Sequence, residues 1–287
     1  MGSSLVSVAL GTFDGVHLGH KSVLDTALSG GYCAEVVTFK KVPRFELMGK
    51  NEGLVMTPSE KKRILLNMGF HRVHTLDFDE VKDVSAADFL EFLTSTFNPQ
   101  KICCGYNYRF GRGAEGDTKM LREYCRRNGI EFYAAKEVSM FGVTVSSTAI
   151  RNYIGHGDMK RASAMLGRPF YIFETVVEGD KRGRTMGFPT INQLYPDELV
   201  RPRFGVYATV VEIDGKKYPS VTNIGVRPTF LSDRILSETH ILGFSGDLYG
   251  RAIKTEFLEF MRDETKFSGL AELKNAIEND KNKRINL

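Results

Sequence analysis

Short apolar runs alternate with segments of helical periodicity along the first half of the chain. The apolar runs predict five strands, at 5–10, 34–39, 72–76, 101–105 and 130–135. Strands separated by helices favour right-handed crossovers, and therefore a parallel sheet with helices on both faces. In such sheets ligands bind at the carboxyl ends of the strands, near the point where the strand order reverses. The pattern thus predicts an α/β unit with a site at those ends.

Helix start signals lie between these runs. Thr57, Pro58 and Glu60 make a capping-box pattern with proline at the first helical position, which predicts a helix that ends near Gly69. Further helices are expected from about Gly19, from Ser85, and from about Thr118 to Asn128.

The pattern changes after about residue 168. Five stretches are strand-like, at 170–178, 204–213, 216–224, 238–244 and 252–261. Turns such as Asp214-Gly215 and Ser245-Gly246 join them, which favours an antiparallel sheet, and we expect a small β-barrel followed by a helix over about 270–278. A helical segment over 149–166 is expected to join the halves. The expected domains are therefore 1–155, a helical connector 156–168, and 169–287.

Composition limits the classes of protein. The chain has 287 residues, 42% hydrophobic and 26% charged, as expected of a globular protein with a sizeable core. The sequence shows no apolar run of membrane-spanning length and no secretory signal, so we expect no membrane partner. Four cysteines without a CxxC pair predict reduced thiols in the cytoplasm. A net charge of +4 is too small to indicate nucleic acid and suits an enzyme that handles anionic small molecules.

Two histidines, His17 and His20, follow the first predicted strand in the stretch GTFDGVHLGH (11–20). At positions i and i+3 of a helix start their side chains share one face. The free amides and the dipole of a helix N-terminus attract anions, and imidazole donors add to such a phosphate site. Gly11, Gly15 and Gly19 permit a tight turn. Two other interpretations are a plain turn with surface histidines and a metal site, although a metal needs a third ligand that the spacing does not suggest.

The stretch GTFDGVHLGH resembles the HxGH motif of the nucleotidyltransferase superfamily. Within it the chain is most similar to the flavin adenylyltransferase module of bacterial bifunctional riboflavin kinase/FAD synthetases. The resemblance implies a Rossmann-like parallel sheet and transfer of a nucleotidyl group from ATP with no covalent enzyme intermediate. It also implies that His17 and His20 stabilise the transferring α-phosphate and that Gly11, Phe13 and Asp14 bind ATP. Asp14 is a candidate partner for metal-bound water as well, or a simple turn residue.

Two further stretches carry the same resemblance. GYNYRFGRGAEGD (105–117) resembles the flavin loop of the family, where Asn107 matches the position that contacts flavin. VSSTAIRNYI (145–154) resembles its second ATP motif, so Ser147, Thr148 and Arg151 are expected to hold the triphosphate, and Arg151 the leaving pyrophosphate. Hydroxyls, amides and a forked cation at a helix start suit a pyrophosphate. Taken alone, this motif also fits a helix N-cap with a solvated arginine.

The second half carries the glycine-rich segment GDKRGRTMGFPTIN (179–192). It has no Walker A pattern, and alone it also fits a basic turn. The segment resembles the riboflavin kinase motif GxxxGRxxGFPTxN, in which threonine and asparagine bind MgATP. Gly179 and Gly183 are then expected to bind ATP, and Thr190 and Asn192 to bind both ATP and Mg²⁺. Ile191 replaces the usual alanine, and strand alternation turns its side chain away from its neighbours.

Two more positions follow from the resemblance. ETHILGFSGDLYG (238–250) resembles the catalytic strand, so Glu238 matches the carboxylate that takes the proton from the ribityl 5′-hydroxyl as it attacks the γ-phosphate. Without that resemblance, a carboxylate at a strand start is ordinarily solvent-facing. Arg262, in FMRDETKF (260–267), lies where the flavin-binding loop is expected.

The resemblance extends from about Val8 to Asp280 and implies a bifunctional enzyme of flavin cofactor synthesis. The barrel is expected to phosphorylate riboflavin to FMN, and the α/β domain to adenylate FMN to FAD with release of pyrophosphate. ATP is then a co-substrate, the flavins are substrates or products, and Mg²⁺ is the expected metal. We expect a monomer or weak homo-oligomer and no nucleic acid partner.

Two other functions remain open at this stage. Class I aminoacyl-tRNA synthetases share the two-histidine motif, but they need a KMSKS-type loop where this chain has SSTAIR. A flavin-binding regulator is a barrel that has kept ligand binding and lost turnover, against which the presence of Thr190, Asn192 and Glu238 argues.

Overall fold

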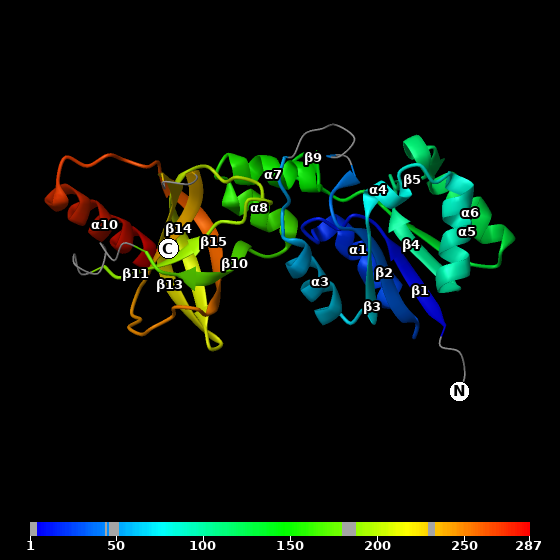
Figure 1. Cartoon of the computed structure of the whole chain (residues 1–287), viewed down its shortest axis with the longest axis horizontal. Helices are drawn as coiled ribbons and strands as arrows, with labels where there is room; N and C mark the ends of the chain where they lie inside the picture. Colours follow the sequence, from blue (N-terminus) through cyan, green and yellow to red (C-terminus); the bar gives the residue numbers. More distant parts are fainter. Residues whose placement is uncertain (1–4, 44, 46–51, 180–187, 229–232) are drawn as a thin grey trace. The chain divides into compact units, whose positions relative to one another are not determined.

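The computed structural model describes residues 5–43, 45, 52–179, 188–228 and 233–287. The chain forms two compact units, Met1–Ala149 and Ile150–Leu287 (Figure 1). This division falls inside a helix, and the expected domain boundaries after residues 155 and 168 stay predictions.

Within its described residues, the first unit contains a five-stranded parallel sheet of order β3-β2-β1-β4-β7. Its strands are β1 (Val6–Leu10), β2 (Cys33–Phe39), β3 (Arg72–Leu76), β4 (Lys101–Gly105) and β7 (Glu131–Ala135). From β1 the chain first adds β2 and β3 on one side, and then β4 and β7 on the other. The strand order therefore reverses between β1 and β4. Leu10 pairs with Cys104 there, and the chain leaves both strands at the same edge of the sheet. The five predicted strands are confirmed, and this edge is the place where such sheets bind ligands.

Helices cover both faces of this sheet, as predicted. Its longer helices are α1 (Leu18–Leu28), α3 (Pro58–Asn67), α5 (Ala86–Phe97) and α6 (Thr118–Arg127). Successive residues of β1 point to opposite faces: Ala9 packs with α1 and α3, and Val8 and Leu10 pack with α5 and α6. Because both faces are covered, the central strand β1 is buried over residues 7–10.

Shorter elements decorate the loops of this unit. They are α4 (Phe78–Val81), β5 (Arg109–Phe110), the 3₁₀ turn η1 (Arg112–Ala114), β6 (Gly116–Asp117), β8 (Ser139–Met140) and β9 (Val143–Thr144). The sequence pattern did not predict these short pieces, because two to four residues carry no periodicity.

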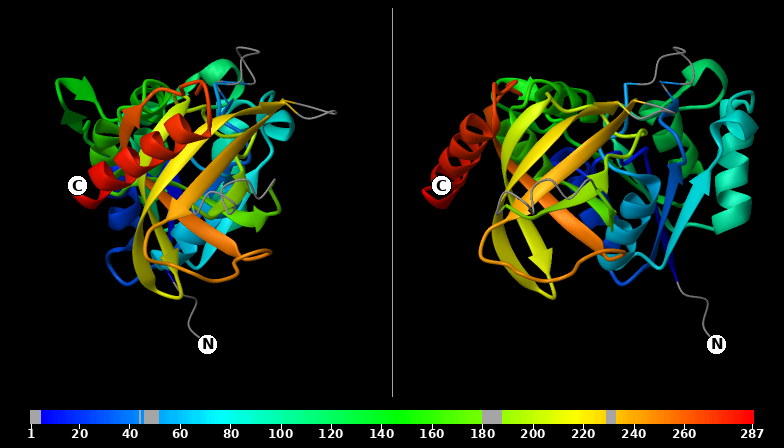
Figure 2. Two further views of the ribbon diagram at one scale, coloured as in Figure 1. Left: turned by 90° about the vertical axis from the view of Figure 1, so that its left-hand side faces the viewer. Right: turned by 60° about the vertical axis from the view of Figure 1, so that its left-hand side comes forward.

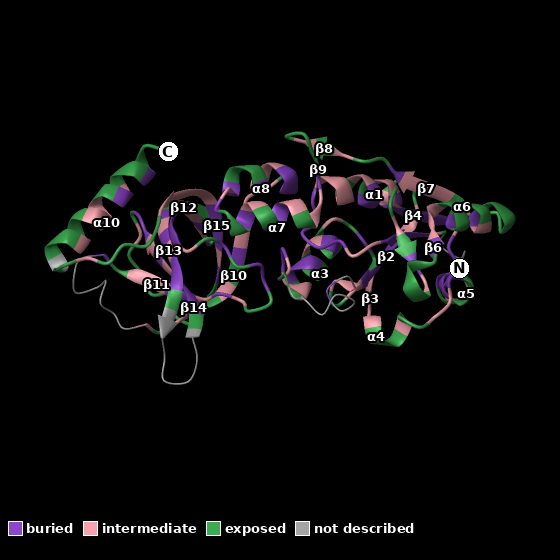
Figure 3. Ribbon diagram, turned by 90° about the horizontal axis from the view of Figure 1, so that it is seen from above, coloured by how far each residue is buried: buried purple, intermediate pink, exposed green. Residues whose placement is uncertain are grey.

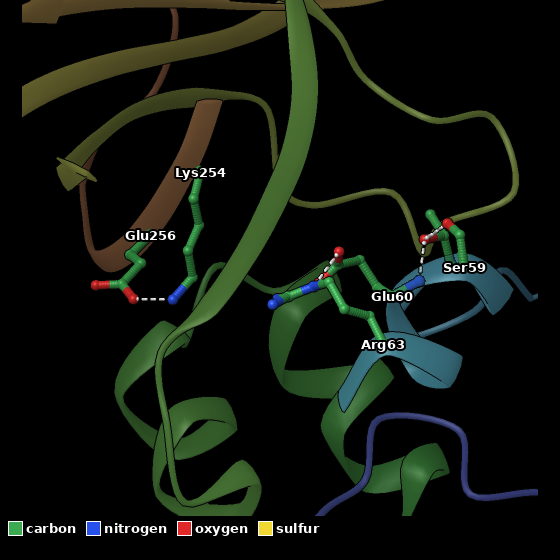
Figure 4. A network of polar contacts seen from close by, with 6 residues as sticks. Ser59, Glu60, Arg63, Lys254 and Glu256 are labelled. Atoms are coloured by element: carbon green, nitrogen blue, oxygen red, sulfur yellow. Dashed lines mark hydrogen bonds and ion pairs between the residues drawn. The ribbon is translucent and has the colours of Figure 1, made fainter. Parts of the chain in front are cut away.

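The predicted start of α3, with Thr57 as the N-cap and Pro58 at the first helical position, is confirmed. The hydroxyl of Thr57 accepts a hydrogen bond from the backbone amide of Glu60 at 3.3 Å, and it also lies 2.9 Å from the hydroxyl of Ser59. Glu60 forms a two-point ion pair with Arg63, at 2.8 and 2.9 Å (Figure 4). The helix start is therefore firmly placed.

The helical segment expected over 149–166 consists of two helices, α7 (Ser147–Gly155) and α8 (Met159–Leu166). Gly157 has a φ of 79°, a left-handed value that ends a helix and that glycine adopts without strain. Asp158 then caps α8 by accepting a hydrogen bond from the amide of Arg161 at 3.1 Å. A single continuous helix over this segment is therefore excluded.

The second unit is built on a closed antiparallel barrel of order β10-β11-β14-β13-β12-β15 (Figure 2). Its strands are β10 (Phe170–Val177), β11 (Thr190–Leu194), β12 (Gly205–Ile213), β13 (Lys216–Pro228), β14 (Asp233–Ile241) and β15 (Ala252–Arg262). Five of these overlap the predicted strands, although β14 begins five residues before the predicted strand and ends at Ile241, and β11 comes from the end of the glycine-rich segment. The predicted turn between β12 and β13 is confirmed, with Asp214 and Gly215 both at positive φ.

Hydroxyl groups fill part of the interior of the barrel. The hydroxyl of Thr209 lies 2.8 Å from that of Ser220 and 2.7 Å from that of Thr222, which is in turn 2.9 Å from Thr239. These side chains are fully buried, so their mutual hydrogen bonds satisfy groups that water cannot reach. Figure 3 shows buried positions along the strands of the barrel, β13 among them. Alternation along the strands then places their neighbours, Glu238 among them, on the outer face.

The C-terminal helix α10 (Leu270–Ile285) lies along the outside of the barrel (Figure 2). It is longer than the predicted helix. Arg262 of β15 forms an ion pair with Asp280 of this helix at 2.7 Å, and Arg284 donates to the backbone oxygen of Thr209 at 3.0 Å. These contacts fix the helix on the barrel.

Candidate functional site

The turn between β1 and α1 has an unusual backbone. Phe13, Gly15 and Val16 all have left-handed angles, with φ of 49°, 86° and 41°. Such angles are uncommon for any residue with a side chain, and most of all for a β-branched one. They persist only where surrounding contacts over-determine them, and they cluster at functional sites. The turn is therefore a candidate site on conformational grounds, independently of its sequence motif.

Asp14 holds this turn against two other segments. Its carboxylate is buried and accepts hydrogen bonds from the amides of Val55, at 2.9 Å, and Met56, at 3.4 Å. The hydroxyl of Ser147, at the start of α7, donates to the backbone oxygen of Asp14 at 2.8 Å. The two predicted ATP motifs are thus in direct contact. Asp14 itself has a structural part in the turn, and its predicted contact with ATP or metal-bound water stays a prediction.

Gly11 and Phe13 shape the underside of the turn. A side chain at Gly11 would meet the ring of Phe13 at 2.9 Å, so glycine is what lets the ring lie there. Phe13 is buried, and its ring meets that of His20 edge-on at 5.3 Å. Both predicted ATP-binding residues therefore support the histidine pair.

The rings of His17 and His20 are stacked, with centroids 3.5 Å apart. His17 is the N-cap of α1, and its Nδ1 accepts a hydrogen bond from the amide of His20 at 3.3 Å. In the neutral ring the proton then sits on Nε2, which makes this atom a donor. Burial, with smaller effects from the charges of His17 and Lys61, holds the pKa of His20 well below its usual value. His20 is therefore a neutral imidazole at physiological pH.

His20 has a polar atom that suits a ligand. Its Nδ1 is buried and has no hydrogen-bond partner among the described residues. Buried polar groups without a partner are rare in folded proteins and are typical of sites that bind something. The pair thus presents imidazole groups at the N-terminus of α1, at the carboxyl end of β1.

Lys61 is a residue that the sequence interpretation missed. It is 7% exposed, and its ammonium donates to the backbone oxygens of Thr12 (3.0 Å) and Phe39 (2.8 Å) and to the hydroxyl of Thr38 (3.2 Å). Burial lowers its pKa to about 8, although Asp14 acts in the opposite direction. One feature of the sequence could have drawn attention to Lys61. It lies near the N-terminus of α3, where a positive charge opposes the helix dipole.

The second ATP motif begins α7. Ser147 is engaged with the turn, Thr148 is exposed, and Arg151 is buried. Arg151 follows Ser147 by four residues, so the two lie on one face of the helix. The solvated arginine of the plain N-cap interpretation is excluded, whereas the contact of Arg151 with pyrophosphate stays a prediction.

Asn107 lies just beyond the end of β4, and its side chain is exposed. Because β1 and β4 are adjacent and parallel, Asn107 and the histidine turn leave the sheet at the same edge, on either side of the reversal in strand order. This placement fits the predicted contact with flavin, which no described contact tests.

The outer face of the barrel carries the second group of candidates. Asn192 of β11 and Asn223 of β13 both lie directly opposite Glu238 of β14. Residues paired in this way have Cβ atoms about 5 Å apart. Thr190 precedes Asn192 by two residues and so shares its face, as predicted, whereas Ile191 packs against the barrel core. Asn223 was not singled out from sequence, because its register with Glu238 is a tertiary property.

The glycine-rich segment is described only at its ends. Gly183 and the rest of 180–187 lie outside the described residues. At Gly179 an added Cβ would come within 2.2 Å of Nδ2 of Asn192, so the backbone of Gly179 and the amide of Asn192 are in close contact. The hydroxyl of Thr190 and the amide oxygen of Asn192 are the hard oxygen donors that Mg²⁺ prefers. The donor set therefore fits this metal.

Replacing Gly179 by alanine is expected to lower the riboflavin phosphorylation that the resemblance implies for this face by about tenfold or more, because the new methyl group displaces the Asn192 amide and misplacement of about 1 Å is costly in catalysis. The measurement is kcat and KM for ATP in riboflavin phosphorylation. Gly155→Ala is the matched control, since a Cβ there meets only the oxygen of Arg201, at 3.9 Å. Unchanged kinetics in Gly179→Ala contradicts a role for this contact.

Arg262 is engaged elsewhere in the structure. Its guanidinium pairs with both carboxylate oxygens of Asp280 and also donates to the backbone oxygen of Asp263 at 3.1 Å. Its evident role is to hold α10. The predicted contact with flavin stays a prediction. The neighbouring Glu264 accepts a hydrogen bond from Asn223 at 3.3 Å, so the segment after β15 reaches the face that carries Glu238.

Lys254 and Glu256 form an ion pair on β15 (Figure 4). Glu256 is buried and also pairs with Lys217 at 3.1 Å. Although burial opposes it, the two lysines together hold the pKa of Glu256 below its usual value. This pair satisfies the buried carboxylate of Glu256, whereas Glu238 lies opposite Asn192 on β11.

The fold and these two groups of residues define a class of protein: an ATP-dependent transferase with an α/β nucleotidyltransferase unit and a β-barrel kinase unit. The family model described as FAD synthetase matches residues 3–149, and the one described as riboflavin kinase matches residues 166–287. The chain belongs to the bifunctional riboflavin kinase/FMN adenylyltransferase family. It phosphorylates riboflavin to FMN and adenylates FMN to FAD, with ATP as co-substrate in both steps.

Relatives agree over nearly the whole chain. The Bacillus subtilis bifunctional riboflavin kinase/FMN adenylyltransferase is 34% identical over 97% of this chain and 91% of its own length. The Pseudomonas fluorescens enzyme of that name is 35% identical over 94% and 89%. A solved structure described as a macrolide-efflux protein from Streptococcus pneumoniae is 29% identical, with a TM-score of 0.89 over 100% of this chain and 96% of its own. Among the described residues of the present chain, no helix has the length and apolar character needed to cross a bilayer.

Proposed function

We propose that the two reactions use separate groups of residues, FMN adenylylation at the turn 11–20 with the start of α7, and riboflavin phosphorylation at the outer face of β11 and β14. The proposal rests chiefly on the stacked pair His17–His20 at the carboxyl end of β1. The register that sets Asn192 opposite Glu238 supports its second half.

In the adenylylation step, a phosphate oxygen of FMN attacks the α-phosphorus of ATP, and the bond to pyrophosphate breaks. The Nε2–H of His17 and the neutral ring of His20 donate hydrogen bonds to the oxygens on which charge grows. The N-terminal end of the α1 dipole faces the same charge. Arg151, Ser147 and Thr148 hold the leaving pyrophosphate. Gly11, Phe13 and Asp14 keep the turn in the shape that presents the histidines.

In the phosphorylation step, the oxygen of the ribityl 5′-hydroxyl attacks the γ-phosphorus of ATP, and ADP leaves. Glu238 accepts the proton of that hydroxyl. Thr190 and Asn192 would hold Mg²⁺, which supplies charge neutralisation at the phosphates when it is bound. Gly179 and Gly183 bind the phosphates through their backbone. Asn107 contacts the flavin at the adenylylation site, and Arg262 contacts it at the phosphorylation site.

The setting of the enzyme belongs to the same proposal. We place it in the cytoplasm, as a monomer or weak homo-oligomer with small-molecule substrates and no nucleic acid or membrane partner. The mild net charge of +4 supports the absence of a nucleic acid partner.

Incubation with riboflavin, ATP and Mg²⁺ tests the order of the two steps, because the barrel must supply the FMN that the α/β unit consumes. FMN is expected to rise first and FAD to follow after a lag, as measured by chromatography over time. In a second experiment the riboflavin is isotopically labelled and unlabelled FMN is added. Labelled FAD that forms without any labelled FMN in solution would contradict the release of FMN between two separate sites.

A further inference from the structure

Lys61 is a buried cation whose contacts all lie at strand ends. Thr12 follows β1, and Thr38 and Phe39 end β2, so the ammonium joins two neighbouring strands where they leave the sheet. The hydroxyl of Thr38 also donates to the oxygen of Thr12, at 2.9 Å. All three donors of the ammonium therefore have partners, as a buried charge requires.

The contact with Thr12 comes immediately before the strained turn. The next residue, Phe13, has left-handed backbone angles, and its ring supports His20. A strained backbone needs contacts on both sides to hold it. Asp14 supplies them after Phe13, through Val55 and Met56, and Lys61 supplies them before it.

The charge of Lys61 acts electrostatically on the histidine pair. It contributes to the lowered pKa of His20, and Asp14 in turn acts on Lys61. The titratable groups that face Lys61 are therefore Asp14 from the turn and His20, stacked on His17, from α1. An ammonium is costly to bury, and near the N-terminus of α3 it also opposes the helix dipole. An apolar side chain of similar length would avoid both costs, so its position calls for a function.

We propose that Lys61 is a positioning residue for FMN adenylylation: it fixes the strained turn beneath His17 and His20 and supplies a fixed positive charge to the adjoining nucleotide phosphate site. This inference rests on the proposed location of adenylylation at that turn. Its chemistry requires an anionic ligand at the carboxyl ends of β1 and β2, which the polyphosphate of ATP provides.

The pH dependence of the wild-type enzyme tests the charge without any substitution. Since the pKa of Lys61 is about 8, the positive charge is present below pH 8 and is lost as the pH rises through that value. The kcat/KM for ATP in FMN adenylylation reports the free enzyme, and it is expected to fall about tenfold between pH 7 and 9.5. The same ratio for riboflavin phosphorylation, measured in the same chain, is expected to lack this fall. A flat adenylylation profile over this range overturns the proposal.

Lys61→Met tests the same residue by removing the charge at similar length. FAD formation from FMN at pH 7 is expected to fall at least tenfold, the decline above pH 8 to disappear, and riboflavin phosphorylation to stay unchanged. Lys62→Met, at the exposed neighbouring position of α3, is the matched control and is expected to behave as wild type. A Lys61→Met enzyme with wild-type adenylylation and an unchanged pH profile overturns the proposal.

A third variant separates failure of this inference from failure of the site itself. If His20→Ala leaves FAD formation intact, the location of the adenylylation site is wrong, and the role of Lys61 is overturned with it. If His20→Ala loses FAD formation and Lys61→Met does not, only the role of Lys61 is overturned.

Discussion

The Glu238→Gln enzyme is expected to lose riboflavin phosphorylation, with kcat lower by about a hundredfold or more, because general-base catalysis contributes roughly 10²–10⁴-fold. Glutamine keeps the shape of the side chain and its place opposite Asn192 and Asn223, but it cannot accept the proton of the ribityl hydroxyl. FAD formation from added FMN is expected to continue at the wild-type rate. The measurement is the initial rate of each reaction, followed separately by chromatography of the flavins.

Glu212→Gln is the matched control for this variant. Glu212 is a half-buried strand glutamate of the same barrel, on β12, between the buried residues Val211 and Ile213. Its replacement is expected to leave the kcat of both reactions unchanged. Wild-type phosphorylation by the Glu238→Gln enzyme would remove Glu238 as the base and leave the barrel without an assigned proton acceptor.

The His20→Ala enzyme is expected to show the opposite separation. Loss of one preorganised donor to a developing charge costs about 10²–10³ in kcat, so FAD formation from FMN is expected to fall by about that factor. Riboflavin phosphorylation is expected to be unaffected, and FMN to accumulate when riboflavin is the substrate. The readout is the initial rate of FAD formation from FMN and ATP at saturating concentrations.

His71→Ala is the control for a histidine of the same unit, since His71 is exposed at the loop before β3. Because the ring of His20 also packs on Phe13, the thermal unfolding of both variants is recorded with the rates. A folded His20→Ala enzyme that forms FAD within about twofold of the wild-type rate would contradict the assignment of the histidine pair, given the size of the expected effect.

Together these two variants separate the reactions within one chain. Each leaves one activity as the internal reference for the other, so a general loss of protein quality is not mistaken for a catalytic effect. A mixture of the two variant enzymes is then expected to convert riboflavin to FAD, with FMN passing through solution.

Local patterns in the sequence determined most of the elements of this protein. The five apolar runs of the α/β unit became β1, β2, β3, β4 and β7, and the capping box at Thr57 started α3 where it was expected. These features are local: hydrophobic period and capping chemistry act over a few residues. The HxGH motif and the PTIN end of the glycine-rich segment could also be recognised from the sequence, because each motif consists of consecutive residues.

The tertiary structure alone decided how separate segments meet. The hydrogen bond from Ser147 to Asp14 joins segments 133 residues apart, and the register of β11, β14 and β13 brings Asn192 and Asn223 opposite Glu238. The sequence around Arg262 resembles a flavin-binding loop, and only the packing of α10 on the barrel revealed the ion pair of Arg262 with Asp280. Lys61 had no motif at all, and the hydroxyl-lined barrel interior left no mark on the strand pattern, because threonine suits a strand on either face. Sequence determines which residues can form an element, whereas burial and register, which depend on the whole chain, determine what each side chain touches.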